Sequence, residues 1–147
     1  MRSPQEEAPP VILTDTGPLV ALFDPKDSLH QESRNALEKI REPLLTTVPV
    51  LTEAFHMLTP ASRGSDRLRD FVLQRGLSVW FLSTTALERA FELMERYPDH
   101  PMDLADSSLV VAAETLSTRK LFTFDRKDFE PYRVKRGHRH YPFEILS

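Results

Sequence analysis

Short apolar runs alternate with longer amphipathic segments along most of the chain. The apolar runs predict five strands, the last of them at a sheet edge, at residues 11–14, 44–48, 77–82, 120–124 and 143–146. Apolar positions at helical spacing predict helices at residues 19–23, 29–40, 50–58, 62–74, 86–96 and 102–117. Strands that alternate with helices form a mostly parallel sheet covered on both faces. The pattern therefore predicts an α/β fold with a central, mostly parallel sheet of four to five strands.

Two residues mark helix boundaries within this pattern. Pro49 is expected as the first residue of the helix that follows the second strand, because proline needs no hydrogen-bond partner for its nitrogen there. Gly76 is expected as the C-cap of helix 62–74, because glycine takes the left-handed conformation easily. The segment between them is therefore expected to hold two helices.

Length and composition limit what the chain can be. Its 147 residues fit one domain, expected over residues 11–147 after a flexible, proline-rich tail at residues 1–10. No apolar run approaches the roughly 20 residues that span a bilayer, and the N-terminus lacks a secretory signal, so we expect a cytoplasmic protein with no membrane association. The absence of cysteine excludes disulfides, thiolate zinc sites and a cysteine nucleophile. The net charge of −3 argues against a protein that is basic over its whole surface.

Two aspartates follow directly on predicted strands. Asp15 ends the first strand and Asp125 ends the fourth. In open α/β sheets, ligands bind beyond the carboxyl ends of the strands, so both side chains are expected on that edge. The alternative, with about even odds for each residue alone, is that it caps the next turn or helix.

A second pair of aspartates begins the helix at residues 102–117. Asp103 and Asp106 are three positions apart and therefore share a helix face. Asp106 is also in line with the apolar residues Leu109, Val110 and Ala113, so the stripe that docks on the sheet begins with a carboxylate. A helix N-terminus favours negative charge, which accounts for one aspartate as the N-cap, in our interpretation Asp103. It does not account for the second carboxylate on the inward face.

Glu53 lies at the border of the buried stripe of helix 50–58, a place where a glutamate is most often only solvated. The four or five carboxylates, brought together, would repel one another and must protonate or hold cations. Oxygen ligands without cysteine or paired histidines suit Mg²⁺ or Mn²⁺. Such ions activate water and stabilise charge on a phosphodiester, so the reaction class indicated is metal-assisted phosphodiester hydrolysis.

Four segments of the chain resemble, in order, the acidic motifs of PIN-domain nucleases, with the bacterial VapC-like group as the nearest match. They are Asp15-Thr16-Gly17-Pro18-Leu19-Val20, Thr52-Glu53-Ala54, Met102-Asp103-Leu104-Ala105-Asp106-Ser107 and Phe122-Thr123-Phe124-Asp125-Arg126-Lys127-Asp128. Each motif is weak alone, but four in order at suitable spacing are fairly specific. The resemblance covers residues 11–129.

The resemblance implies an α/β/α sandwich and a ribonuclease that depends on one or two Mg²⁺ or Mn²⁺ ions. By position, the catalytic and metal-binding quartet is Asp15, Glu53, Asp106 and Asp125, with Asp103 as a further metal ligand and Asp128 in the outer shell. Many VapC-like proteins are toxins restrained by a cognate antitoxin. An antitoxin partner and a homodimer are therefore implied as well.

An RNA backbone that enters an acidic pocket needs basic groups beside it. The candidates are Arg126, Lys127, Arg133, Lys135, Arg136 and Arg139. Tyr132 and Tyr141 are interleaved with them and are predicted to stack on unpaired bases. A second basic set is Arg63, Arg67, Arg69 and Arg75. The alternative for each of these residues is an ordinary solvated surface. His138 and His140 are a weak metal signal, because they are two positions apart with no cysteine partner, and His30, His56 and His100 are interpreted as incidental.

The preferred hypothesis is a divalent-metal-dependent endoribonuclease that leaves a 5′-phosphate and a 3′-hydroxyl. Whether it is the toxin of a type II toxin–antitoxin pair or a housekeeping nuclease stays open. The alternative is a non-catalytic PIN-fold module that binds RNA or protein, since no histidine or lysine stands where a proton carrier is obvious. The triplet Asp15-Thr16-Gly17 also occurs in aspartic proteases, but those proteins are all-β and this chain is rich in predicted helices.

Overall fold

A five-stranded parallel sheet forms the centre of the computed structural model, which describes residues 10–147. The tail predicted at residues 1–10 lies outside this range except for Pro10. The strands, in spatial order, are β3 (Ser78–Trp80), β2 (Leu44–Thr47), β1 (Ile12–Thr14), β4 (Lys120–Phe122) and β7 (Glu144–Leu146). Every neighbouring pair in this sheet is parallel. The predicted fold class and the number of strands are therefore confirmed.

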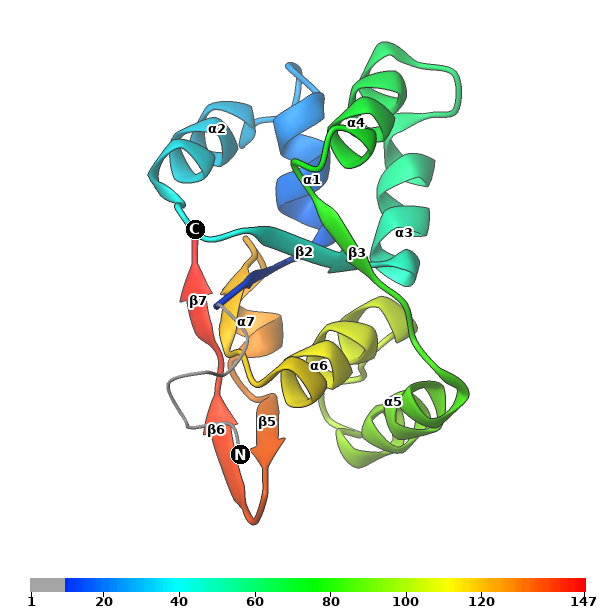
Figure 1. The fold of residues 1–147 in the computed structure, drawn as a ribbon, viewed down its shortest axis with the longest axis vertical. Helices are drawn as coiled ribbons and strands as arrows, with labels where there is room; N and C mark the ends of the chain where they lie inside the picture. Colours follow the sequence, from blue (N-terminus) through cyan, green and yellow to red (C-terminus); the bar gives the residue numbers. More distant parts are fainter. Residues whose placement is uncertain (1–9) are drawn as a thin grey trace, which may run out of the picture.

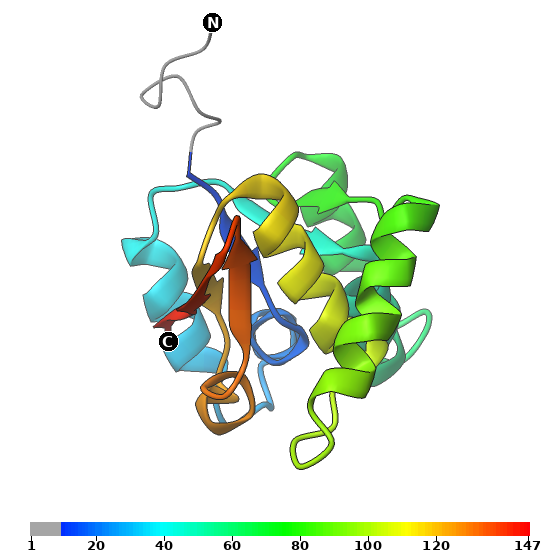
Figure 2. The same cartoon turned by 90° about the horizontal axis from the view of Figure 1, so that it is seen from below.

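Helices cover both faces of the sheet, as Figures 1 and 2 show. They are α1 (Thr16–Phe23), α2 (His30–Lys39), α3 (Val48–Leu58), α4 (Arg63–Leu73), α5 (Thr84–Arg96), α6 (Leu104–Leu116) and the short α7 (Arg126–Phe129). Helices α1, α2 and α4 lie on one side, and α5 and α6 lie on the other (Figure 1). Helix α3 contacts both α1 and α6. It therefore connects the two helical layers at one end of the sheet.

The central strands β1 and β4 bring together segments that are far apart in the sequence. Leu13 pairs with Leu121 in register, and both side chains are fully buried. Helix α6 packs against β1 and β2, and its Leu109 and Val110 are completely buried. Burial of large apolar side chains is the main favourable term in folding. The two strands therefore end side by side at the same edge, although about a hundred residues separate them in sequence.

Two elements were not predicted. Helix α7 follows β4, and an antiparallel hairpin of β5 (Arg133–Arg136) and β6 (Arg139–Pro142) stands apart from the main sheet. In Figure 1 the hairpin projects beyond the rest of the ribbon. Its turn contains Gly137, whose φ of 65° suits a tight hairpin turn.

The end of α4 differs from the prediction that Gly76 is its C-cap. Arg75 takes the left-handed conformation instead, with φ of 68°, and Gly76 donates its N–H to the carbonyl of Phe71 at 2.9 Å. This is a Schellman ending displaced by one residue. Gly76 is needed for space, because a Cβ atom there would lie 2.1 Å from the Phe71 ring. Pro49 lies in the first turn of α3, which begins one residue earlier, at Val48.

Across residues 10–147, none of the helices is both long enough and apolar enough to cross a membrane.

Candidate active site

Asp15 lies at the carboxyl end of β1 and is almost completely buried, with 4% of its surface exposed. Its backbone N–H donates to the carbonyl of Phe122 on the neighbouring strand at 3.0 Å. The hydroxyl of Thr123 donates to Asp15 Oδ2 at 2.8 Å and accepts the backbone N–H of Asp125 at 3.0 Å. One hydroxyl therefore joins the two strand-end segments that the sequence placed at this edge.

Neither strand-end aspartate acts as a helix cap through its side chain. Asp15 occupies the N-cap position of α1 and Asp125 that of α7, yet neither side chain makes a capping hydrogen bond. Capping was the structural alternative for these two residues. Helix capping therefore does not account for either carboxylate.

Asp103 and Asp106 form a reciprocal capping box at the start of α6. The backbone N–H of Asp106 donates to Asp103 Oδ1 at 2.8 Å, and that of Asp103 donates to Asp106 Oδ2 at 3.3 Å. The interpretation of Asp103 as the N-cap is confirmed. The box also holds the Asp106 carboxylate in place, and it leaves one oxygen of each residue outside these bonds.

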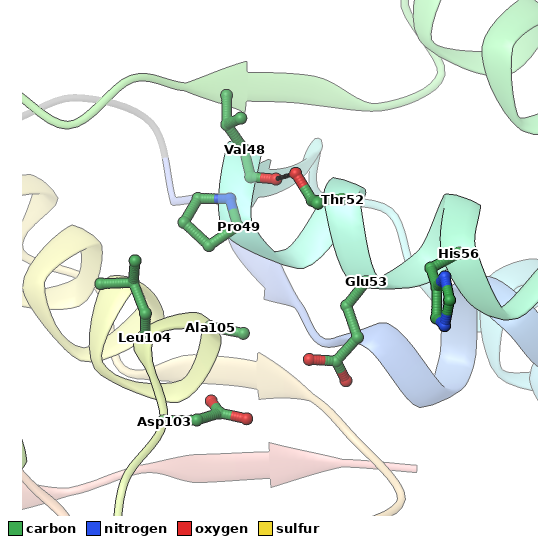
Figure 3. Close-up of a pocket in the computed structure, with 8 residues that line it drawn as sticks. All are labelled: Val48, Pro49, Thr52, Glu53, His56, Asp103, Leu104 and Ala105. Atoms are coloured by element: carbon green, nitrogen blue, oxygen red, sulfur yellow. Dashed lines mark hydrogen bonds between the residues drawn. The ribbon is translucent and has the colours of Figure 1, made fainter.

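Glu53 reaches the same region from α3. Figure 3 shows its carboxylate pointing toward that of Asp103, across a pocket between α3 and the start of α6. The pocket has a volume of about 530 Å³, and its lining also includes Pro49 and Leu104. His56, one turn further along α3, lines it as well. His56 is one of the histidines interpreted from the sequence as incidental. Its spacing of three residues from Glu53, which places both on one side of α3, was the only sequence feature that indicated a shared pocket.

All four members of the acidic quartet have raised pKa values. Burial raises the pKa of Asp15 to about 6; the Thr123 hydrogen bond opposes this rise, and the charges of Asp125 and Glu53 add to it. Burial and the neighbouring Asp103 raise the pKa of Asp106 to about 8. For Glu53 and Asp125, burial again comes first, followed by nearby carboxylates. Asp15, Glu53 and Asp106 each have a pKa raised by at least one other quartet member, whereas the carboxylate that raises the pKa of Asp125 is Asp128.

The donor set fits a hard divalent cation. All the side chains are carboxylates, the ligands that Mg²⁺ and Mn²⁺ prefer. The Thr16 hydroxyl lies close enough to Glu53 to lower the pKa of that carboxyl. It makes no hydrogen bond of normal geometry, however, and within residues 10–147 it is the one buried side-chain polar atom without a partner. An unsatisfied hydroxyl beside crowded carboxylates is where a cation or its water would supply the missing contact.

The carboxylates lie near one another but do not form a complete set of metal ligands in this conformation. Within residues 10–147, no three histidine, aspartate or glutamate side chains already form a metal-binding group. Asp103 and Asp106 are held by their capping box, whereas Glu53 and Asp125 are exposed and free to turn. Closing a coordination shell therefore requires rotation of exposed side chains, with the buried Asp15 as the fixed member.

The predicted RNA-binding cations fall into two places. Arg126 and Lys127 follow Asp125 directly and line a surface pocket of about 480 Å³ with it. The hairpin lies along α6. Tyr132, just before β5, donates its hydroxyl to the carbonyl of His100, just before α6, and the Lys135 N–H donates to Glu114 near the other end of that helix. Lys135, Arg136 and Arg139 are exposed there. They are therefore separated from the acidic quartet by most of the length of α6.

Other aromatic and basic residues of this region are already engaged. The prediction that Tyr132 stacks on bases is wrong, because only 1% of it is exposed and it packs between Tyr97 and Phe129. Apolar packing was the stronger demand on this ring. Tyr141 is half-buried beneath the Arg119 guanidinium, and Arg133 donates to backbone carbonyls at the base of the hairpin.

Comparison with known families gives one domain match. The family model described as PIN domain matches residues 12–135. A relative from Mycobacterium tuberculosis, Ribonuclease VapC26, is 26% identical over 132 residues, which cover 87% of this chain and 96% of that protein.

Solved structures show the same fold. VapC20 of Mycobacterium tuberculosis, described as a Sarcin-Ricin loop cleaving toxin, has a TM-score of 0.73 at 18% identity and covers 80% of this chain and 92% of its own. A toxin-antitoxin complex from Klebsiella pneumoniae has a TM-score of 0.62 at 22% identity, with 80% and 89% covered. VapBC2 from Rickettsia felis, bound to a DNA fragment from its promoter, has a TM-score of 0.62 at 14% identity, with 93% and 99% covered.

Proposed function

Because this chain belongs to the PIN-domain family, we propose that it is a divalent-metal-dependent endoribonuclease and the toxin of a type II toxin–antitoxin pair. The observation that carries the proposal is the buried Asp15, which makes no capping hydrogen bond and whose pKa is raised by burial and by the charges of Asp125 and Glu53. The similarity to the relative named Ribonuclease VapC26 supports the cleavage of RNA. A single nuclease domain over residues 11–147 is part of the proposal.

Asp15, Glu53, Asp106 and Asp125 would hold one or two Mg²⁺ or Mn²⁺ ions, with Asp103 as a supporting ligand. When bound, such an ion supplies an activated water and positive charge for the phosphate oxygens. Thr123 positions Asp15 by its hydrogen bond, and the capping box positions Asp106. These contacts prepare part of the ligand set before the ion arrives, which lowers the cost of binding it.

Arg126 and Lys127 would hold the RNA backbone beside the quartet. Their position next to Asp125 places positive charge at the rim of the acidic region. A phosphate that approaches the carboxylates needs such charge, because the quartet alone repels it. Without these cations, the RNA would meet only carboxylates at this edge of the sheet.

The proposed partners are an antitoxin protein and a second copy of the chain. The antitoxin is supported by two structures of similar fold, the toxin-antitoxin complex from Klebsiella pneumoniae and VapBC2 from Rickettsia felis. The homodimer rests on the family resemblance alone.

Calorimetric titration of the protein with Mn²⁺, paired with cleavage of a labelled RNA, tests the function. We expect binding at millimolar Mn²⁺ or below, cleavage with either metal, and loss of cleavage in EDTA. The matched variants are Asp15→Asn and Asp70→Asn, the latter an exposed aspartate on α4. Binding and cleavage should be lost only in the first. If the wild-type protein bound RNA but neither metal nor cleavage were detected, the non-catalytic alternative would replace this proposal.

A further inference from the structure

The β5–β6 hairpin has an unusual charge composition. Across residues 133–142 it carries Arg133, Lys135, Arg136 and Arg139 but no carboxylate, in a chain whose net charge is −3. Arg133 is turned onto backbone carbonyls at the base. The other three cations are exposed, and none of them forms a salt bridge within residues 10–147. We call Lys135, Arg136 and Arg139 the distal cations.

The register of the hairpin places like charges opposite one another. Arg136 pairs with Arg139 directly across the two strands. Like charges directly opposite on an antiparallel pair destabilise it, so this arrangement does not serve the stability of the hairpin. The tight turn at Gly137 holds the two arginines on the same face of a two-stranded ribbon. An external anion between them would relieve the repulsion.

The hairpin is anchored at a defined distance from the acidic quartet. Arg89 binds Glu114 through two hydrogen bonds of 3.0 and 3.1 Å, and the same carboxylate accepts the Lys135 N–H at 3.1 Å. Glu114 lies eight residues after Asp106, which is about 12 Å along the helix axis. Figure 2 shows β5 running beside α6. The distal cations therefore lie near the end of α6 that is remote from the quartet, and we call the stretch of α6 and β5 between them the track.

We propose that the distal cations form a second phosphate-binding site for the same RNA, remote from the bond that is cleaved. This inference rests on the proposed function and names its substrate class: RNAs that extend beyond the scissile phosphate. At about 3.4 Å per stacked nucleotide, 12 Å corresponds to about four nucleotides. Arginine suits this role because its planar guanidinium binds phosphate through two hydrogen bonds.

RNA is the occupant because one continuous polyanion satisfies both ends of the track. Its phosphates recur at a spacing that reaches the hairpin while another phosphate lies at the quartet. The contact would be independent of base identity, since the phosphate backbone carries no sequence information. It would therefore add affinity and favour longer RNAs without choosing the sequence that is cleaved.

The test compares a trinucleotide with an RNA of about 20 nucleotides, long enough to span the track. The variant is Arg136→Ala/Arg139→Ala, and the matched control is Lys39→Ala/Arg41→Ala, which removes two exposed cations at the end of α2. For the variant we expect kcat/KM on the long RNA to fall about tenfold. The slope of log(kcat/KM) against log(salt) should lessen by about 1.4, for two lost phosphate contacts. Cleavage of the trinucleotide should not change, and the control should match the wild type with both RNAs.

Thermal unfolding separates loss of the phosphate-binding site from loss of stability, and RNA binding separates it from loss of catalysis. Removing a like-charge pair should leave the melting temperature unchanged or raise it. Equal losses on both RNAs, no loss on either, or a fall in melting temperature that accounts for the loss would each overturn the proposal. Loss of binding to an acidic protein partner with RNA affinity unchanged would overturn it too. Fluorescence anisotropy with the long RNA in EDTA measures the site even if the wild-type protein cleaves nothing, so failure of the proposed function is seen separately.

Discussion

The Thr123 hydroxyl donates to the Asp15 carboxylate and in the same geometry accepts the backbone N–H of Asp125. Thr123 is fully buried, so both bonds are shielded from water. A single side chain thus sets the position of one quartet member and the start of the segment that carries another. Thr123 is therefore a positioning residue.

Thr123→Val should weaken metal binding without removing any proposed ligand. Loss of the hydrogen bond raises the pKa of Asp15 further and costs about 1 kcal/mol of stability. Calorimetric Mn²⁺ binding at several pH values should show the onset of binding shifted to higher pH. Thr123→Ser keeps the hydroxyl and should restore the wild-type onset. An unchanged onset in Thr123→Val would show that the hydrogen bond does not tune Asp15.

Asp15→Asn and Asp106→Asn should each abolish RNA cleavage while the fold stays intact. The amide cannot carry the charge that holds the cation, but it has nearly the same shape as the carboxylate. Circular dichroism should match the wild type, and RNA cleavage in Mg²⁺ should fall to background. Asp70→Asn is the control and should be fully active. Full activity in both quartet variants, together with EDTA-resistant cleavage by the wild type, would refute the assignment.

Stability of the metal-free protein should fall as the pH rises. The pKa of Asp15 is about 6 in the folded chain against an ordinary 3.8, so between these values the folded state binds the extra proton. The free energy of unfolding is therefore highest below pH 3.8 as far as this group is concerned, and it falls by roughly 3 kcal/mol as the pH rises through 6. Asp106, with a pKa of about 8, extends the fall in the same direction.

Urea unfolding in EDTA at pH 5, 7 and 8 measures this dependence. Mn²⁺ should reverse the loss at pH 8, because the cation compensates the ionised carboxylates. Asp15→Asn should flatten the profile between pH 5 and 7. Stability that rises with pH across this range in EDTA would contradict the raised pKa values.

The two roles of Asp103 can be separated by a pair of substitutions. Asp103→Ser keeps a side chain that caps α6 but removes the carboxylate, whereas Asp103→Ala removes both. The alanine variant should lose about 1 kcal/mol of stability and the serine variant much less. Cleavage should fall equally in both if the carboxylate supports the metal. If serine were as active as the wild type, Asp103 would be a cap only.

The sheet, the six longer helices and the acidic positions could be predicted because each leaves a strong local pattern. Asp15 and Asp125 follow buried strands, and parallel strands end at a common edge, so their proximity follows from the fold class. Asp106 stood out because it begins an apolar stripe. These inferences needed only periodicity and the geometry of parallel sheets.

The remaining features depend on contacts that no local pattern carries. The hairpin shows only Val134 and Tyr141 as an apolar pair among charged residues, too few for a strand signal. Tyr132 reads as an accessible aromatic among cations, but packing with Tyr97 and Phe129 buries it. Gly76 is required by the close approach of the Phe71 ring, a contact within the fold that the sequence does not show, while Arg75 takes the left-handed conformation.

The pairing of β1 with β4 also has a consequence for synthesis on the ribosome. About a hundred residues separate these neighbouring strands, and Asp15 acquires its hydrogen bonds to Phe122 and Thr123 only when the later segment is present. Closing so long a loop is slow compared with forming local helices. A nascent chain that stops before residue 120 therefore lacks the proposed active site, however well its first helices have folded. The proposed nuclease activity would begin only after the ribosome has synthesised β4 and the segment that follows it.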